Sequence, residues 1–525
     1  MDLLVRIYEL EDWITYKNCN HVTSFTEANE FIYFGTSGGI VPYQRYQRHW
    51  GEPYTVSNGL GDDQISAVFY DRSTGYLWAS HREGVSFLNP TEERWENSSQ
   101  ESFPRDVQEV VRLGKKNASI LASTVSGLVL SIDQHLGFYQ GTYNNESNSI
   151  GWSPSRLDPV PNIEHFSINE PYQIDPGGKV YDGFFREYSI NLFHVDENLD
   201  IYGGIWELGI LTGDYNVKRL RVHSFGPLEN SISAVELMQD KIICGSLHSS
   251  SAERAGLSIM HIADGEWTYC EDRFINELAS PNIFDLQEDG EGRIWIGTDQ
   301  GLSIYDYPQD RWQRISGAQG LQDEYIQTIC IDDTLAWIGT PLGLNKIHIP
   351  TMIIKRVYLT RDKQHMKIFK LIADGKFLWI GTENGLYRVD KLTHNVEHYD
   401  MNGTLLDIDQ PVASSVSAIA AGDSLTIFAQ YNGLLAYNHM TTNFTLLPDL
   451  IDAQIVDIDS DDRYLWIGTD DGAYLMRLSD HYVEHYTTLD GLPDQRVNRV
   501  VINDSLVWFG TGQGLCRYKW RKYAD

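Results

Sequence analysis

The chain has 525 residues, of which 42% are hydrophobic and 12% aromatic. This length exceeds what one hydrophobic core usually supports, so the sequence predicts two compact units that fold throughout. The formal net charge is -32, from 73 acidic and 41 basic residues. Such a field repels phosphate backbones and anionic headgroups, which excludes nucleic acid as an expected partner.

The amino terminus, MDLLVRIYELEDW, lacks a basic start followed by an apolar run, so no signal peptide is visible in the sequence as given. No segment reaches the roughly 18 uninterrupted apolar residues of a membrane-spanning helix, and we expect no direct membrane insertion. The cysteines are too scattered for a zinc site or a redox motif and are expected to be buried apolar residues. They are Cys19, Cys244, Cys270, Cys330 and Cys516.

One phrase recurs along the whole chain. Its looser copies are IYFGTSGGIVPY from 32, LWASHREGVSFL from 77, ILASTVSGLVLS from 120, IYGGIWELGILT from 201, IICGSLHSSSAERAGLSI from 242 and TIFAQYNGLLAY from 426. Its close copies are IWIGTDQGLSIYD from 294, AWIGTPLGLNKIH from 336, LWIGTENGLYRVD from 378, LWIGTDDGAYLMR from 465 and VWFGTGQGLCRYK from 507. The spacing of about 42 residues is the length of one four-stranded propeller blade.

The phrase reads as two strands joined by a tight turn. In LWIGT, bulky and small residues alternate as in a strand packed between neighbouring sheets, so Trp295, Trp337 and Trp379 are expected in the core. The glycine allows the next sheet to approach, and the threonine can bond the backbone of the turn. Another strand precedes each phrase, as in IFDLQEDGEGRIWIGT from 283, and a fourth follows, as in DRWQRISG from 310. Helical periodicity is nowhere sustained.

The sequence therefore predicts an all-β chain of two β-propellers with about 11 to 12 four-stranded blades, because propellers normally hold four to eight blades. We expect a first propeller over residues 1–214, with four clear blades and an irregular one near 140–190, and a second, seven-bladed propeller over 215–525. The segment PYQIDPGGKVYDGFFREY from 171 is either a degenerate blade or an inserted hairpin. RLRVHSFG from 219 is expected to supply the outer strand that the second ring lacks.

Two arrangements of the rings stay open. In the preferred one the rings are in tandem, and the early strand DWITYKNC closes the first ring. In the other one the amino terminus completes the last blade, and one ring is inserted in the other.

The WIGTxxGL phrase after a GLxxxxV start resembles the two-component regulator propeller repeat family, strongly over 283–520 and weakly over 100–270. The resemblance implies the fold of periplasmic sensor propellers in hybrid two-component systems that detect glycans, and of related exported propeller proteins. It thus implies a periplasmic or extracellular location. The chain as given departs from the sensors because it has no following immunoglobulin-like domain, membrane helix or kinase.

Motifs that look catalytic do not fit their required contexts. Gly35-Thr36-Ser37-Gly38-Gly39 matches GxSxG, but a strand follows where a nucleophile elbow needs a helix. Gly510, Gly512 and Gly514 belong to the turn of the repeat and do not open a helix. DIDSDD from 457 lacks the glycine and distal glutamate of a calcium loop and is interpreted as a solvated turn. We therefore expect no enzyme activity, no metal and no cofactor.

Ligand contacts are expected on the face that carries the turns between the second and third strands and the links that enter each first strand, because loops there need not stabilise the core. Side chains on that face suit sugar hydroxyls or a protein loop. The candidate ligand-binding residues are Arg82, Glu83, Trp206, Glu207, Asp299, Gln300, Glu324, Tyr325, Glu383, Asn384, Tyr431, Asp470, Asp471, Asp494 and Arg496.

Three functions are compatible with this sequence. The first is a non-catalytic module that senses or binds a glycan or peptide on the top face. The second is a scaffold or interaction protein of a bacterial envelope or secretion complex, and the third is a propeller lyase or glycosidase. A repeat of this kind specifies a fold and leaves function to the sites added to it.

Overall fold

The computed structural model describes residues 8–99, 109–143, 150–248, 254–412, 414–430, 433–448, 450–461 and 463–524. The fold is all-β, as predicted, with mainly antiparallel sheets, most of four or five strands, and a few single-turn 3-10 helices. The helical turns are Val56–Asn58 (η1), Asp272–Phe274 (η3), Gly317–Gln319 (η4) and Trp520–Lys522 (η5). In the part of the chain that is described, no helix is long and apolar enough to cross a membrane.

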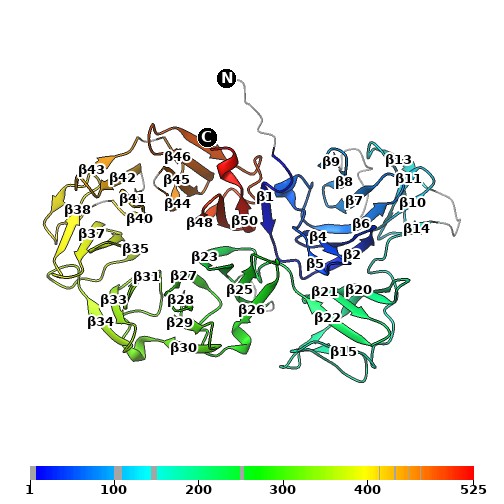
Figure 1. The fold of residues 1–525 in the computed structure, drawn as a ribbon, viewed down its shortest axis with the longest axis horizontal. Helices are drawn as coiled ribbons and strands as arrows, with labels where there is room; N and C mark the ends of the chain where they lie inside the picture. Colours follow the sequence, from blue (N-terminus) through cyan, green and yellow to red (C-terminus); the bar gives the residue numbers. More distant parts are fainter. Residues whose placement is uncertain are drawn as a thin grey trace. The chain divides into compact units, whose positions relative to one another are not determined.

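The chain forms two compact units. The first unit consists of Met1–Gly226 and Ala263–Trp267, and the second of Pro227–Ile262 and Thr268–Asp525. The sheets of each unit are the blades of a β-propeller (Figure 1).

Four sheets of the first unit have the strand order of a propeller blade. Their strands are Val22–Glu27 (β2), Phe31–Thr36 (β3), Gly39–Gln44 (β4) and His49–Trp50 (β5); Ile65–Asp71 (β6), Tyr76–His81 (β7), Gly84–Asn89 (β8) and Arg94–Ser99 (β9); Val110–Lys116 (β10), Ser119–Thr124 (β11), Val129–Asp133 (β12), Tyr139–Thr142 (β13) and Gly151–Trp152 (β14); and Ile190–Val195 (β19), Asp200–Ile205 (β20), Gly209–Asp214 (β21), Arg219–His223 (β22) and Ser167–Ile168 (β15). β14 adds to β10, and β15 pairs in parallel with β22.

The irregular region of this unit contains a small sheet. Its strands are Gln173–Ile174 (β16), Val180–Tyr181 (β17) and Glu187–Tyr188 (β18). The segment from 171 therefore forms a short three-stranded sheet, while residues 144–149 lie outside the described part of the chain.

The first strands of the blades lie against one another around the first unit. β2 contacts β6, β6 contacts β10, and β2 also contacts β19 and β20. A Cβ atom on Gly204 would lie 2.6 Å from Cβ of Val22, so the blade that contains β20 packs directly on the blade that begins with β2. Asn191 Nδ2 donates to the carbonyl of Val22 at 2.6 Å across the same seam.

Seven sheets follow one another in the second unit. Their strands are Ile232–Met238 (β23), Lys241–Ser246 (β24), Gly256–His261 (β25) and Trp267–Glu271 (β26); Ile283–Glu288 (β27), Arg293–Thr298 (β28), Gly301–Asp306 (β29) and Arg311–Ile315 (β30); Thr328–Asp332 (β31), Leu335–Thr340 (β32), Gly343–His348 (β33) and Ile353–Val357 (β34); Ile368–Asp374 (β35), Phe377–Thr382 (β36), Gly385–Asp390 (β37), Val396–Tyr399 (β38) and Leu405–Leu406 (β39); Val416–Ala421 (β40), Leu425–Gln430 (β41), Gly433–Asn438 (β42) and Phe444–Leu446 (β43); Ile455–Ser460 (β44), Tyr464–Thr469 (β45), Gly472–Arg477 (β46) and Val483–Tyr486 (β47); and Val497–Asn503 (β48), Leu506–Thr511 (β49) and Gly514–Tyr518 (β50).

The second unit closes as a ring. Its first strands contact one another in the order β23, β27, β31, β35, β40, β44 and β48, and β48 contacts β23 again. Asn498 Nδ2 donates to the carbonyl of Ile232 at 3.0 Å where the ring closes. The strand order of the last sheet is β1-β50-β49-β48, with β1 at Trp13–Tyr16. This is the order of the arrangement in which the amino terminus completes the last blade, and not of the preferred tandem one.

The segment from Arg219 was expected to supply the outer strand that the second ring lacks, and this expectation is wrong. Arg219–His223 (β22) pairs antiparallel with β21, with Asp214 opposite Arg219. The strand therefore completes the last blade of the first unit, and the predicted boundary after residue 214 separates two paired strands. The hydrophobic alternation that identified the strand could not show which sheet it joins.

The glycine of each phrase lies where one sheet meets the next. A Cβ atom on Gly245 would lie 2.4 Å from Cγ2 of Ile283, and one on Gly510 would lie 3.0 Å from Cγ2 of Ile232. No side chain fits between these backbones without displacing the β-branched residue that begins the next sheet. Close approach at the glycine, as predicted, is thus a property of the seam between blades.

The tryptophans of the phrases fill the interior, as predicted. Trp295, Trp337 and Trp379, as well as Trp466 and Trp508, are at most 1% exposed. Their indole rings bury large apolar areas between adjacent sheets, which stabilises the stack of blades. The five cysteines are also buried and free, as expected.

We predict that Gly245→Ala destabilises the second unit by about 1–3 kcal/mol, because the added methyl group must displace Ile283. Chemical unfolding monitored by tryptophan fluorescence measures this change. Gly317→Ala is the matched control, because its Cβ atom would meet only the end of the Glu324 side chain at 3.4 Å. Equal unfolding free energies for the two variants would contradict a tight seam at Gly245.

Candidate functional site

Each turn between the second and third strands of a blade is held by the threonine that ends the phrase. Thr36 Oγ1 donates to the carbonyl of Gly39 at 2.8 Å, and Thr298 Oγ1 donates to that of Gly301 at 2.8 Å. In the first of these turns, the backbone N–H of Gly38 donates to Thr36 Oγ1 at 3.1 Å. These hydrogen bonds order the backbone of the turns that carry the predicted ligand-binding residues.

A cavity of about 600 Å³ lies among the blades of the first unit. It is formed by the links that enter first strands and by the turns between second and third strands, which is the face predicted to bind a ligand. The volume is typical of sites that hold small molecules. The lining residues are His21, Thr23, Ser37, Gln64, Ile65, Ser66, Ser80, His81, Arg82, Gly84, Val85, Glu109, Val110, Leu130, Arg156 and Trp206.

Trp206 forms an aromatic wall of this cavity. Its side chain is 40% exposed, although its backbone N–H donates to the carbonyl of Ser189 at 2.9 Å. The imidazole of His21 meets the indole edge-on, with ring centroids 4.5 Å apart. An indole that is held in place yet exposed is a ready surface for stacking against a ligand.

The interior of the cavity combines apolar and polar groups. Ile65, Val85, Val110 and Leu130 supply the apolar part of its lining. This mixture is typical of sites where a few polar groups orient a ligand that is otherwise held by apolar contact.

His81 is a neutral histidine within the lining. Burial lowers the pKa of His81 to about 4, and its Nε2 lies 2.7 Å from Ser86 Oγ. His81 Nδ1 and the hydroxyl of Ser80 are buried and have no hydrogen-bond partner among the described residues. These two atoms therefore keep hydrogen-bonding capacity within the lining.

The charged residues at the rim differ in their pairing. Arg156 Nη2 pairs with Glu109 at 2.7 Å. Glu207, at the tip next to Trp206, pairs with Arg186. Arg82 is exposed and no ion pair is found for it among the described side chains, so it can meet an anionic ligand group.

The structure thus brings together two of the predicted residues, Arg82 and Trp206, in one cavity. Glu83 and Glu207 stand at the adjacent turn tips and are not part of its lining. His21 and Arg156 were missed by the sequence argument. Arg156 follows the irregular strand β14, where no copy of the repeat predicts its position, and His21 precedes β2 in a link of ordinary polarity.

In the second unit, Asp299 and Tyr325 lie close together. Asp299 Oδ2 accepts a hydrogen bond from Asn282 Nδ2 at 3.1 Å, and Oδ1 is buried without a partner in the described part of the chain. The ring of Tyr325 packs 4.6 Å from that of Phe284. Burial and then the charge of Asp299 raise the pKa of Tyr325.

Gln300 and Glu324, the sequence neighbours of these two residues, are held by local contacts. The carbonyl of Gln300 accepts from Arg314 Nη2 at 2.9 Å. Glu324 is exposed, and its Oε1 accepts from the backbone N–H of Gly317 at 3.1 Å. These contacts order the loops and do not indicate a ligand.

Glu383 and Asn384 also order loops. Glu383 Oε1 accepts from the backbone N–H of Lys367 at 2.9 Å. Asn384 Oδ1 accepts from the backbone N–H of Val412 at 2.6 Å, and its Nδ2 donates to the hydroxyl of Tyr387 at 3.1 Å. The amide of Asn384 is therefore used within the protein.

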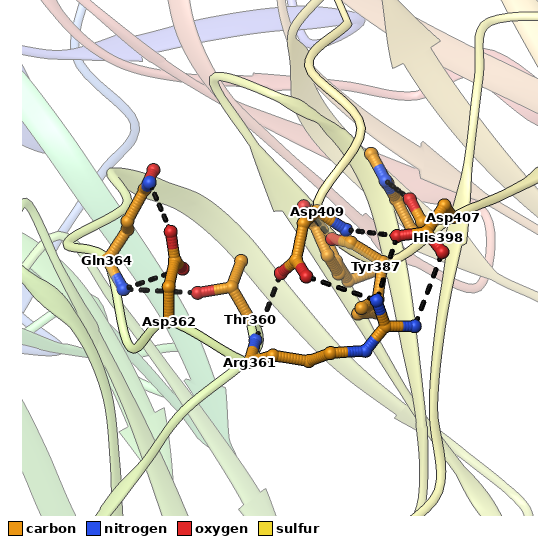
Figure 2. Close-up of polar contacts among 9 residues, drawn as sticks. Thr360, Arg361, Asp362, Gln364, Tyr387, His398, Asp407 and Asp409 are labelled. Carbon is orange, nitrogen blue, oxygen red and sulfur yellow. Dashed lines mark hydrogen bonds and ion pairs between the residues drawn. The ribbon is translucent and has the colours of Figure 1, made fainter.

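Figure 2 shows the polar contacts of the loop at residues 360–364 with Asp407 and Asp409, beside Tyr387 and His398. The ring of His398 stacks on Tyr387 with centroids 4.2 Å apart, and Arg361 Nη1 lies 3.3 Å from carboxylate oxygens of both Asp407 and Asp409. The ion pairs are exposed and contribute little to stability. The group ties one loop to the next, and the charge of Arg361 is paired within the protein.

Asp470 and Asp471 accept hydrogen bonds in the same way. Asp470 Oδ1 accepts from the backbone N–H of Gln454 at 2.9 Å. The carbonyl of Asp471 accepts from His485 Nε2 at 2.6 Å. Tyr431 lies outside the described residues.

Arg496 and Asp494 belong to one entering link. Arg496 is exposed, and its Nε donates to Asn498 Oδ1 at 3.0 Å. Asp494 Oδ1 accepts from the backbone N–H of Arg496 at 3.4 Å. The predicted residues of the second unit are thus engaged mainly in holding turns.

The acidic phrase DIDSDD was interpreted as a solvated turn, and this interpretation is wrong for its first half. Asp457 and Asp459 lie on β44, where they accept from the backbone N–H groups of Val500 (3.1 Å) and Ile502 (2.7 Å) on the next sheet. Burial raises the pKa of Asp459 to about 6. The carboxylates therefore link neighbouring blades.

A partly buried carboxylate, Glu236, lies on the first strand of the second unit. Its Oε1 accepts from the backbone N–H of Glu288 at 3.2 Å and from Gln287 Nε2 at 3.2 Å. Burial raises the pKa of Glu236 to about 7, with Asp285 acting in the same direction and Arg499 against it. The guanidinium of Arg499 in turn contacts Asp285.

Neither catalytic-looking motif lies next to the helix that its chemistry requires. Ser37 of the GxSxG match is followed by strand β4, and Gly514 of the glycine-rich match begins strand β50. Within the described ranges, no three His, Cys, Asp or Glu side chains gather as a metal ion would require.

One family model matches part of the repeated sequence. Residues 277–300 match the model described as Two component regulator propeller, which confirms the resemblance carried by the repeated phrase. No curated protein matches the chain.

Solved structures share the propeller fold. The chain is similar to PorZ of Porphyromonas gingivalis, described as an essential bacterial surface component of the type-IX secretion system, with 12% identity, a TM-score of 0.53 and coverage of 97% of this chain and 87% of that one. It is also similar to the extracellular domains of the systems BT3049 (14% identity, TM-score 0.46, covering 97% and 76%) and BT4673 (14%, 0.44, covering 95% and 70%) from B. thetaiotaomicron. At these identities the likeness to PorZ shows the fold alone.

We predict that Glu236→Gln makes the second unit more stable than the wild type at pH 8 and leaves the difference small at pH 4. The folded pKa of about 7 lies above the usual 4.5, so the folded state holds an extra proton between these values. The wild type therefore loses stability as the pH rises through this window, and the variant lacks this loss. Thermal melts across the pH range measure this difference in stability between the variant and the wild type.

Glu277→Gln is the control for this prediction, because Glu277 is exposed. A pH dependence that is identical in wild type, Glu236→Gln and Glu277→Gln would show that Glu236 does not titrate with folding.

Proposed function

We propose that the chain is a non-catalytic, extracytoplasmic binding or sensing module that holds a glycan in the cavity of its first unit. The observation that carries the proposal is the exposed, fixed indole of Trp206 in a cavity of about 600 Å³ with apolar and hydroxyl groups. The apolar face of a sugar ring stacks on an indole, while hydroxyl, amide and imidazole groups bond its hydroxyls.

The guanidinium of Arg82 has no ion pair among the described residues, and it favours some glycans over others. A cation at the rim stands out in a chain of net charge -32 and favours a ligand that carries a negative group. A peptide carboxylate is the alternative ligand of the same chemistry.

The location outside the cytoplasm is supported by the repeat family. Residues 277–300 match the Two component regulator propeller model, a family whose members include periplasmic sensors and exported propeller proteins. PorZ, which shares the fold, is itself described as a bacterial surface component.

Hydrolysis is not favoured, although a serine and a histidine meet in the cavity. Ser37 Oγ lies 3.4 Å from His21 Nδ1, but the hydroxyl donates to the carbonyl of Asn18 at 3.3 Å. A serine nucleophile must instead give its proton to the base. The carboxylate of the lining, Glu109, is paired with Arg156, which does not favour a glycosidase or lyase.

We predict that Trp206→Ala lowers the affinity for an oligosaccharide at least about tenfold, because a stacking surface worth about 1.4 kcal/mol or more is lost. A glycan array identifies the oligosaccharide, and isothermal titration calorimetry measures the affinity. Tyr46→Ala is the matched control, because Tyr46 is 75% exposed and outside the cavity lining.

The absence of binding to every oligosaccharide on the array would contradict the glycan proposal. Binding that Trp206→Ala leaves unchanged would also contradict it. Binding of peptides alone, weakened by Trp206→Ala, would retain the cavity and change the ligand class.

A scaffold role is the second candidate, and one exposed feature favours it. Phe184 and Phe185 are 62% and 86% exposed. The turn that presents them is rigid, because Asp182 Oδ1 accepts from the backbone N–H groups of Phe184 (2.9 Å) and Arg186 (3.0 Å). Two adjacent exposed phenylalanines on an ordered turn are suited to bind a protein partner.

The double variant Phe184→Ser/Phe185→Ser is expected to lose such a partner without a change in melting temperature, because neither ring contributes to the core. Cross-linking in cells followed by mass spectrometry measures the loss. Leu136→Ser, at a residue that is 61% exposed, is the control, and partners retained by the double variant would count against a scaffold role of this turn.

A further inference from the structure

A second cavity, of about 780 Å³, lies in the second unit between the sheets that begin with β35 and β40. Its lining residues are Lys376, Phe377, Arg388, Tyr399, Asn402, Gly403, Tyr437, Thr442, Asn443, Phe444 and Thr445. None of the predicted site residues is among them.

The lining of the cavity comes from both ends of these blades, because Asn402 and Gly403 follow β38 at the end opposite to the turn of Lys376. Lys376 lies in the turn between β35 and β36, and Thr442 and Asn443 lie in the turn between β42 and β43. Successive turns of an antiparallel meander alternate between its two ends, so these turns stand away from Glu383 and Asn384. No turn between a second and a third strand is part of the lining, so a search of those turns alone misses this cavity.

Aromatic rings surround a guanidinium in its interior. Arg388 lies 4.2 Å above the centroid of Phe377, and its Nη1 donates to the hydroxyl of Tyr437 at 3.1 Å. Its Nε donates to Glu397 at 2.7 Å. The rings of Tyr437 and Phe444 lie 5.0 Å apart. The guanidinium is thus held flat against the rings, and its five N–H donors exceed the number that these contacts use.

Glycine allows the aromatic wall to form. A Cβ atom on Gly403 would lie 2.3 Å from the ring of Phe444, so the chain passes directly over that ring. The phenylalanine is fixed in place without being covered by another side chain at this position. Together with Phe377, it leaves a partly exposed aromatic surface beside Arg388.

The charge of the lining is unusual for this chain. It contains two cations, Lys376 and Arg388, and none of its described residues has a carboxylate, whereas the whole chain has 73 acidic and 41 basic residues. Glu397, which is not part of the lining, pairs with Arg388, so Lys376 is the more available of the two cations. The side chain of Lys376 is 60% exposed, 3.7 Å from Asp390. Amide and hydroxyl groups of Asn402, Asn443 and Thr445 complete the rim.

From these observations we infer that this cavity is a second ligand site, for a sugar that bears a carboxylate. Aromatic rings accept the apolar face of a pyranose ring, and the amides and hydroxyls bond its hydroxyl groups. Lys376 pairs with its carboxylate, and the N–H groups of Arg388 that Glu397 and Tyr437 do not use can donate to it. The site is independent of the cavity in the first unit.

Trigalacturonate and its fully methyl-esterified form test the inference, since esterification removes the charge of each carboxyl group and adds only a methyl group. Calorimetric titrations use the full chain carrying Trp206→Ala, so that the first cavity contributes little. Trigalacturonate is expected to bind, the ester at least about tenfold more weakly, and the affinity is expected to fall as salt is raised.

Lys376→Glu in the same background is expected to weaken trigalacturonate at least about tenfold. Lys363→Glu makes the same charge change at an exposed lysine outside the cavity and is expected to alter the affinity less than about twofold. Gly403→Ala, which must displace Phe444, is expected to weaken binding without unfolding, as checked by its melting temperature.

Three results would overturn the inference: no binding of trigalacturonate, equal binding of the ester, or equal effects of Lys376→Glu and Lys363→Glu. If Gly403→Ala loses its fold together with its binding, the comparison of Lys376→Glu with Lys363→Glu decides whether the cavity binds the ligand.

Discussion

The structure depends on the contact between the glycine of one blade and the β-branched residue that begins the next. A Cβ atom at Gly339 would lie 2.7 Å from Ile368, and one at Gly468 would lie 2.8 Å from Val497. Sheets that approach this closely exclude water from both faces, and the buried tryptophans fill the remaining space. Because every sheet covers the face of its neighbour, no blade is stable alone, and stability is shared around each ring.

The same contact determines where ligands can bind. A glycine near the end of the second strand, followed by a threonine-held turn, brings the tips of several blades to one end of the unit. In the first unit this convergence produces the cavity lined by Arg82 and Trp206. Outside these turns the sheets have no such constraint, and one pair of blades in the second unit leaves a cavity around Arg388.

The repeat made the fold predictable, since the spacing of its phrases specifies sheets of four strands and the alternation within them specifies the buried face. Pairing between distant segments was not predictable in this way: Arg219–His223 joins β21, whereas its alternation suits any sheet edge. Arg82 and Trp206 were predictable because turns of the repeat carry them. His21, Arg156 and the cavity around Arg388 were not, because they depend on irregular links or on space between sheets, which no periodicity encodes.

Binding of a glycan against Trp206 is the function that we propose for the first unit, and a crystal structure can decide it. The crystal would contain the full chain and the oligosaccharide selected by a glycan array. We expect a sugar ring stacked on the indole of Trp206, with its polar groups toward Arg82 and the hydroxyls of the lining. An oligosaccharide bound elsewhere, with this cavity filled only by water, would contradict the proposal.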